Sequence, residues 1–156
     1  MEKMTIKTEK VLAAHRVLSA SKYQKLSDDD KIKVFKICVA LKPIAKKFEE
    51  DSKDAAEKLK PCEDHDQKLQ QAQEYERVTR DPKGDASTLE MGAAEYNDFI
   101  KLMQKYGKLV NEAMKEESEK EVEVEFEKIS QEAFIKLMNS NDWTFTEAEA
   151  VGEIVM

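Results

Sequence analysis

The chain has 156 residues and a formal net charge of −7, and 38% of its residues are charged. This length suits one domain with one hydrophobic core, and such a charge content favours helices that bury one stripe and expose the rest. The four glycines and three prolines are too few for a many-stranded sandwich or barrel, and the acidic balance argues against nucleic acid and membranes as partners.

A short strand and a first helix are predicted at the start of the chain. Residues 4–7 alternate apolar and polar side chains, which is the pattern of a half-buried strand. Thr8 follows and is well placed to cap a helix whose apolar residues run from Val11 to Leu18.

The second predicted helix begins after Ser27, which can cap it, and the aspartates at 28–30 complement the positive end of its dipole. Residues 32–41 are apolar on most sides, so we expect other helices to surround this segment at the centre of the core. Pro43 must kink or interrupt the helix, and helical spacing then resumes as far as Pro61.

A more polar helix is predicted around residues 69–78, and the turn signals in 80–87 make that segment a candidate for a mobile loop. The capping box at 87–90 then opens the clearest helix of the chain. Its apolar residues recur every seven positions in two seams: Leu89, Tyr96, Met103 and Val110, and Gly92, Phe99, Tyr106 and Ala113. Because neighbouring positions are also apolar, the stripe is too wide for a two-helix zipper, and we expect it to pack against the first two helices.

The segment 121–127 alternates glutamate with apolar residues, and this period of two predicts a strand with one covered face. Residues 4–7 and 143–145 are the partners available within the chain, and if neither pairs, the strand edge is left to another subunit. We expect residues 4–7 to pair with it, because their apolar alternation matches. Ser130 and Thr146 are placed to begin two short final helices.

Together these elements predict a single, mainly α domain over residues 1–156. The expected fold is an antiparallel bundle of long helices with a minor two-stranded β element. The two cysteines, Cys38 and Cys62, do not form a disulfide framework, and the start of the sequence lacks a secretory signal. We therefore expect a cytoplasmic protein.

The densest group of potential metal ligands is the run Cys62, Glu63, Asp64, His65 and Asp66. Adjacent residues on a helix point in different directions, and no second cluster of Cys or His completes a tetrahedral site. We therefore favour a solvated helix start with acids near the helix dipole. Cys62, Asp64, His65 and Asp66 are kept as the candidate ligands of the alternative, a metal site.

Residues suited to catalysis are few. His15 and Cys38 lie among apolar residues, which favours a structural histidine and a buried thiol. Motifs for nucleotides, serine nucleophiles, zinc proteases and calcium loops are missing, and the lysines of 31–47 are diluted by the acids at 49–51. We therefore expect a protein that is not an enzyme and has no cofactor.

Four residues are candidates for contacts with a partner: Val122, Val124, Phe126 and Trp143. A two-stranded sheet leaves backbone donors and acceptors open, and these can receive an added strand or a second copy of the chain. Trp143 stands in a polar context and can act as an interface anchor, and a capping role over the end of the bundle is the equal alternative.

A series of short features follows one order along the chain: Met4–Lys7, Val11–Leu18, Lys25-Leu26-Ser27, Lys31–Lys47, Lys105-Tyr106-Gly107, Val122–Phe126 and Thr144-Phe145-Thr146. In this arrangement, which spans most of the sequence, the chain resembles a group of small uncharacterised proteins encoded by tailed bacteriophages and prophages. The resemblance implies a phage or prophage origin and supports pairing of the first strand with the later one. It implies no catalytic residues.

The leading functional hypothesis is a non-enzymatic protein that acts through a protein partner or through self-association. It would serve as a structural, assembly or host-modulating factor, in the host cytoplasm or in the virion if phage-encoded. The alternative is a regulatory protein that binds a metal or another ligand at residues 62–66.

Overall fold

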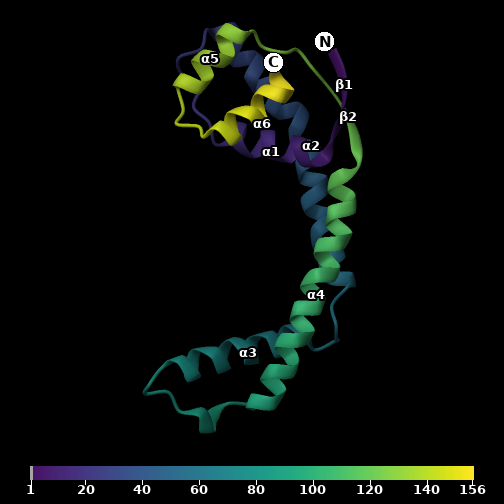
Figure 1. Cartoon of the computed structure of the whole chain (residues 1–156), viewed down its shortest axis with the longest axis vertical. Helices are drawn as coiled ribbons and strands as arrows, with labels where there is room; N and C mark the ends of the chain where they lie inside the picture. The colour runs from purple at the N-terminus through teal and green to yellow at the C-terminus, as the bar shows by residue number, and fades with distance from the viewer. Residues whose placement is uncertain (1) are drawn as a thin grey trace. The chain divides into compact units, whose positions relative to one another are not determined.

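The computed structural model describes residues 2–156 and confirms a mainly α fold with a minor antiparallel sheet (Figure 1). In chain order the elements are β1 (Glu2–Lys7), α1 (Thr8–Ser19), α2 (Asp28–Lys58), α3 (His65–Arg80), the 3-10 turn η1 (Ala86–Thr88), α4 (Ala93–Glu119), β2 (Glu121–Phe126), α5 (Gln131–Asn139) and α6 (Phe145–Val155).

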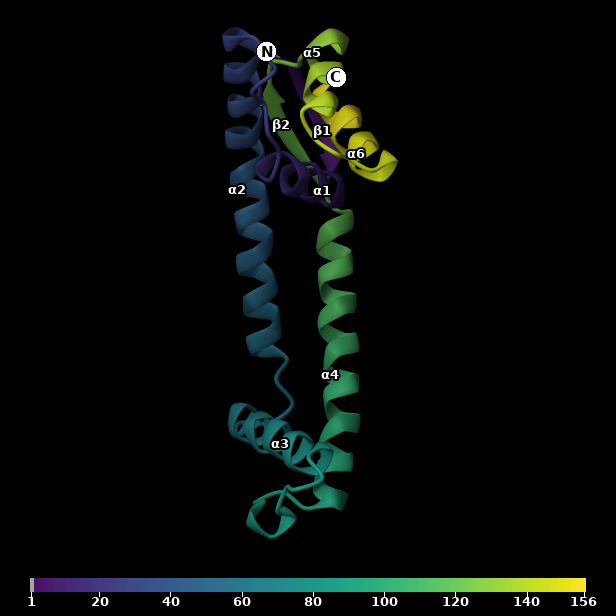
Figure 2. The ribbon, with the colours of Figure 1, turned by 90° about the vertical axis from the view of Figure 1, so that its left-hand side faces the viewer.

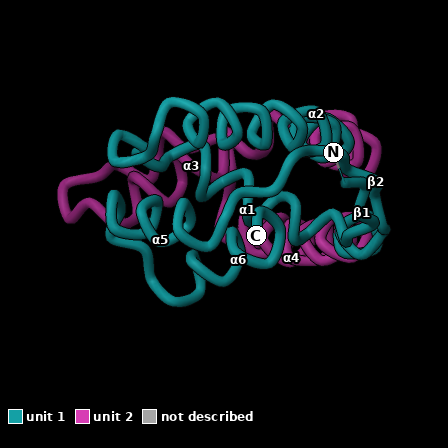
Figure 3. Tube along the Cα trace, turned by 90° about the horizontal axis from the view of Figure 1, so that it is seen from above, with its two compact units in different colours: residues 1–51, 115–156 teal, residues 52–114 magenta. Residues whose placement is uncertain are grey.

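The chain divides into two compact units, which Figure 3 shows in different colours. Unit 1 comprises residues 1–51 and 115–156, and unit 2 comprises residues 52–114. The single domain expected from the length of the chain stays a prediction, and each unit is described by itself.

The sheet of unit 1 has the strand pairing expected from the sequence. Strands β1 and β2 are antiparallel, with Met4 opposite Val124 and Ile6 opposite Val122. Glutamates of β2 and lysines of β1 share the outer face, where Lys3 pairs with Glu123 at 3.4 Å. The apolar side chains therefore share the inner face, as the alternation requires.

Helices cover the inner face of this sheet, which is seen edge-on in Figure 1 with α1, α5 and α6 on one side. Helix α1 packs against α6, and the core joins the sheet to the helices through buried residues that include Val11, Leu41, Phe126, Leu137 and Ile154. Thr8 does not cap α1 with its side chain, since its Oγ1 donates to the carbonyl of Lys120 at 2.8 Å. That bond fastens α1 to the residue before β2.

Helix α2 runs through Pro43 as one element, and Ser27 Oγ accepts a hydrogen bond from the backbone N–H of Asp30 at 3.2 Å. The expectation that 32–41 is surrounded by helices is wrong for half of its surface. Val34, Ile37 and Leu41 are buried, whereas Ile32, Phe35 and Val39 on the opposite face are exposed. In the view of Figure 2, α2 lies to one side of the strands and α5 and α6 lie to the other. The buried residues of α2 belong to the core of unit 1, and its exposed residues do not.

Unit 2 is built by the end of α2, by α3 and the following loop, and by most of α4. Ala72, Met91 and Phe99 form its buried cluster, and the rings of Tyr75 and Tyr96 stack with centroids 4.3 Å apart. Tyr96 Oη donates to the carboxylate of Glu76 at 2.5 Å. The α4 seam therefore packs against α3 in this unit, and Tyr106 Oη donates to the Ala56 carbonyl at the end of α2. Packing of the seam against the first helix stays a prediction.

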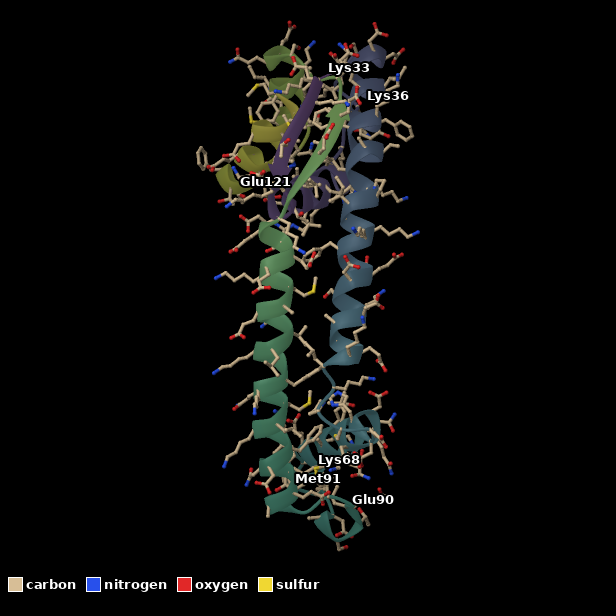
Figure 4. All side chains as sticks on the ribbon, turned by 90° about the vertical axis from the view of Figure 1, so that its right-hand side faces the viewer. Lys33, Lys36, Lys68, Glu90, Met91 and Glu121 are labelled. Atoms are coloured by element: carbon tan, nitrogen blue, oxygen red, sulfur yellow. The ribbon has the colours of Figure 1, made fainter. Side chains whose placement is uncertain are left out.

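The predicted capping box at 87–90 does not begin α4. Helix α4 begins at Ala93, while the carboxylate of Asp85 accepts a hydrogen bond from the Ser87 backbone N–H and shapes the short turn η1. Glu90 accepts a hydrogen bond from Gln71 Nε2 at 2.9 Å instead of folding back on a helix end. Glu90 and Met91 are labelled in Figure 4, and Met91 is buried beside α3.

Candidate interaction surface

An exposed apolar face on α2 is the clearest feature of unit 1 that its own packing does not explain. Ile32, Phe35 and Val39 are 52%, 65% and 52% exposed. Their spacing of three and four residues places them on one side of the helix, opposite the buried side chains that hold α2 to the core. Exposed large apolar residues are ordinary one at a time, whereas three in a row along a helix form a patch.

The same side of α2 continues into charged residues at both ends. Asp28 precedes Ile32 by one turn, and Lys42 and Lys46 follow Val39 at the same helical spacing. We call the six residues together the α2 face: Asp28, Ile32, Phe35, Val39, Lys42 and Lys46.

The charges of the α2 face have few partners within the chain. Asp28 has a 99% exposed side chain and lies 3.9 Å from Lys31, which is a long and solvated ion pair. Lys42 and Lys46 form no ion pair with any other residue of 2–156. Lys33, labelled with Lys36 in Figure 4, points elsewhere and pairs with Glu127 at 3.4 Å. These charges therefore remain available for a partner.

Cys38 lies at the border of the α2 face and is half-buried. Burial raises the pKa of its thiol above the ordinary value, so the thiol stays protonated at neutral pH. A protonated thiol is a weak nucleophile, and Cys38 contributes packing here.

Trp143 is held within unit 1 by a hydrogen bond and an aromatic contact. Its indole Nε1 donates to Ser21 Oγ at 3.1 Å, and its ring lies 6.1 Å from that of Phe134. A shallow depression of about 540 Å³ adjoins it, lined by polar residues such as Arg16 and Asn141. This placement supports the capping role that the sequence left open.

Phe145, two residues further on, is 82% exposed and was not among the predicted contact residues. The cap of α6 is Thr144, whose side chain accepts from the Glu147 backbone N–H, so the expected cap Thr146 is wrong. This capping box places Phe145 at the first helical position, where its side chain faces water. The pattern Thr-Phe-Thr-Glu was the available signal, since it marks the box two residues earlier.

The side chains of the predicted strand contacts face inward. Val124 and Phe126 are buried in the core of unit 1, and Val122 is half-buried against it. A partner at this strand would therefore meet backbone groups and not these side chains. Within residues 2–156 each strand has one neighbour, so both strands keep one edge without a paired strand.

The candidate metal ligands at 62–66 do not converge. His65 is buried between the rings of Phe99 and Tyr106, with centroids 6.1 and 5.3 Å away, and its Nδ1 has no hydrogen-bond partner. Asp66 pairs with Lys60 at 3.2 Å, and the carboxylate of Asp64 lies 3.9 Å from Lys68. Among the described residues no three His, Cys, Asp or Glu side chains are grouped to hold an ion.

Comparison of the chain with models of protein families, with curated proteins and with solved structures finds no match. Over the part of the chain that is described, none of the helices combines the length and apolar character needed to cross a bilayer.

Proposed function

We propose that this is a non-enzymatic protein that acts by binding a protein partner, or a second copy of itself, through the α2 face. The observation that carries the proposal is the exposure of Ile32, Phe35 and Val39 together on one side of α2. Fully burying one such side chain contributes about 1.5 to 3 kcal/mol. These three are already about half covered, so a partner that covered the rest would gain roughly half of that value at each.

The setting of the α2 face also supports this role. Residues 31–48 contain six lysines and no acid, although the whole chain carries a net charge of −7. An apolar stripe with charged residues at both ends suits an amphipathic helix whose own end charges are opposite. A phage or prophage origin, and with it a role in assembly or host modulation, remains a prediction.

The alternative, a metal- or ligand-binding regulatory protein, has weaker support. Its candidate ligands have other surroundings in the structure. The ring of His65 is buried, Asp64 and Asp66 form ion pairs with lysines, and the thiol of Cys62 is partly buried. A metal would have to displace Lys60 and Lys68 from the carboxylates and draw His65 out of its aromatic contacts.

The proposal is tested by site-specific photocrosslinking in cells that produce the protein. A photoreactive phenylalanine analogue replaces Phe35, and the matched control carries it at Ile135 on α5, which is 45% exposed. We expect a discrete crosslinked adduct from position 35 and none from position 135. Adducts from position 135 alone, or from neither position, would contradict the proposed surface.

A further inference from the structure

We propose that the α2 face binds the α2 face of a second copy, with the two helices antiparallel, to form a symmetric homodimer. This inference rests on the proposed function and names its partner. A two-fold symmetric contact requires a surface that complements itself. If one residue of the first copy meets a second residue of the other copy, the reverse contact must also form. The α2 face meets that requirement in both its spacing and its charge.

The spacing of the α2 face is the same when it is read from either end. The residues of the α2 face form three pairs that are centred on the level of Ile37. Phe35 and Val39 lie two residues before and after Ile37, and Ile32 and Lys42 lie five residues before and after it. Asp28 and Lys46 lie nine residues before and after it. With a rise of 1.5 Å per residue, a two-fold axis beside Ile37 therefore brings each residue level with its counterpart in the other helix.

Three layers result on each side of the axis, and each is chemically matched. Phe35 meets Val39 of the second copy, and both side chains leave water. Ile32 lies against the aliphatic stem of the second copy's Lys42, whose ammonium stays in solvent. Asp28 meets the second copy's Lys46 at the outer end, so that the outermost charge at each end of the α2 face finds its opposite.

A parallel arrangement fails on the same residues. It would place Asp28 against Asp28 and Lys46 against Lys46, which repels at both ends of the contact. The pairing of Asp28 with Lys46 therefore favours the antiparallel direction of self-association.

The contact is small, since it uses one face of one helix. Interfaces under about 1,200 Å² in total belong to weak or transient complexes. We therefore expect a dimer in fast exchange, with a Kd on the order of 10 μM to 1 mM. The dimer should be weakened by salt, because its outer pairs are exposed.

The test is sedimentation equilibrium of the full chain from about 5 μM to 1 mM, a range chosen to cover weak association. We expect the average mass to rise from 17.9 kDa toward twice that value in the wild type. Phe35→Asp should weaken the dimer at least tenfold, since it buries a charge at the centre of the contact. The matched control Ile135→Asp, an exposed apolar residue on α5, should leave the Kd unchanged.

Charge reversal tests the antiparallel register. Asp28→Lys and Lys46→Asp should each weaken the dimer about threefold to tenfold, and the double variant should return to within about twofold of the wild type. A wild type that stays at 17.9 kDa throughout would overturn the homodimer. A dimer whose Kd is unchanged by Phe35→Asp would overturn it as well. So would a double reversal variant whose Kd is weaker than that of either single variant.

The two proposals can fail separately. A monomeric protein that still gives an adduct at position 35 in cells refutes the homodimer and supports binding of a different protein. A dimer that is unaffected by Phe35→Asp, together with no adduct at position 35, refutes both.

Discussion

Trp143 donates a hydrogen bond from its indole Nε1 to Ser21 Oγ at 3.1 Å, across 122 residues of sequence. Asn141 joins the same two segments, because its Oδ1 accepts from the backbone N–H of Lys22 and its Nδ2 donates to the Lys22 carbonyl, both at 2.8 Å. The connection after α1 is therefore fastened to the connection before α6 by three hydrogen bonds that no secondary structure supplies.

Trp143→Phe should lower the free energy of unfolding by about 1 kcal/mol, because it removes the hydrogen bond to Ser21 and keeps an aromatic ring near Phe134. Trp143→Ala should cost about 2 to 4 kcal/mol, since the packing is lost as well. Urea unfolding followed by circular dichroism measures both. Equal losses for the two variants would contradict the separate contribution of the ring.

Phe99→Ala should destabilise the protein by about 3 to 5 kcal/mol, because the ring lies in the buried cluster of unit 2 with Ala72 and Met91. Leu102→Ala on the same helix is the control, since Leu102 is exposed, and it should cost under about 1 kcal/mol. Thermal and urea melts give both values. A loss below about 1 kcal/mol for Phe99→Ala would show that the α4 seam does not hold this cluster together.

Removal of residues 1–7 should destabilise unit 1 and expose β2, since Met4 and Ile6 pair with Val124 and Val122. We expect the amides of residues 122–126 that donate to β1 to exchange faster with deuterium, while the amides of α3 keep their protection. Hydrogen exchange measured by mass spectrometry resolves the two segments. Unchanged protection at 122–126 would contradict the strand pairing.

Both cysteines should react slowly with iodoacetamide at pH 8. Burial raises the pKa of the Cys38 thiol, and desolvation together with the nearby Asp64 carboxylate raises the pKa of the Cys62 thiol. A raised pKa leaves less thiolate at a given pH, and the thiolate is the reactive form, so each rate should lie below that of a short cysteine peptide. The variants Cys38→Ser and Cys62→Ser isolate each thiol. A native rate equal to the rate in urea would be the contrary result.

Protein purified without an affinity tag should contain no stoichiometric transition metal, because Asp64, His65 and Asp66 are committed to other contacts. Elemental analysis by mass spectrometry checks this directly. Zinc at one equivalent, lost in Asp64→Asn and Asp66→Asn, would favour the metal-binding alternative.

The sequence predicted an element of the fold correctly where a local pattern is compatible with only one structure. Strict alternation at 121–127 required a one-sided strand, and residues 4–7 offered the matching partner. Ser27 and Ser130 cap their helices as the sequence suggested, because the hydroxyl before a helix accepts a hydrogen bond from a free N–H of its first turn. The capping box at 87–90 failed because Glu90 found a competing partner in Gln71, a contact distant in sequence.

The candidate surface could not be predicted from local pattern. A helix that is apolar on most sides indicates burial on all sides, and whether a neighbour covers each face depends on the tertiary arrangement. The sequence therefore predicted burial of Ile32, Phe35 and Val39. Helical spacing places them on a different face from Val34, Ile37 and Leu41, but it does not show which of the two faces a neighbour covers.

The position of Trp143 gives the protein a built-in optical reporter. It is the one tryptophan of the sequence and belongs to unit 1, whereas the stacked rings of Tyr75 and Tyr96 belong to unit 2. Tryptophan fluorescence excited at long wavelength therefore follows the melting of unit 1, and near-ultraviolet dichroism is sensitive to the tyrosine stack. Coincident curves would mark one cooperative transition over the whole chain, and separated curves would mark two independently melting parts.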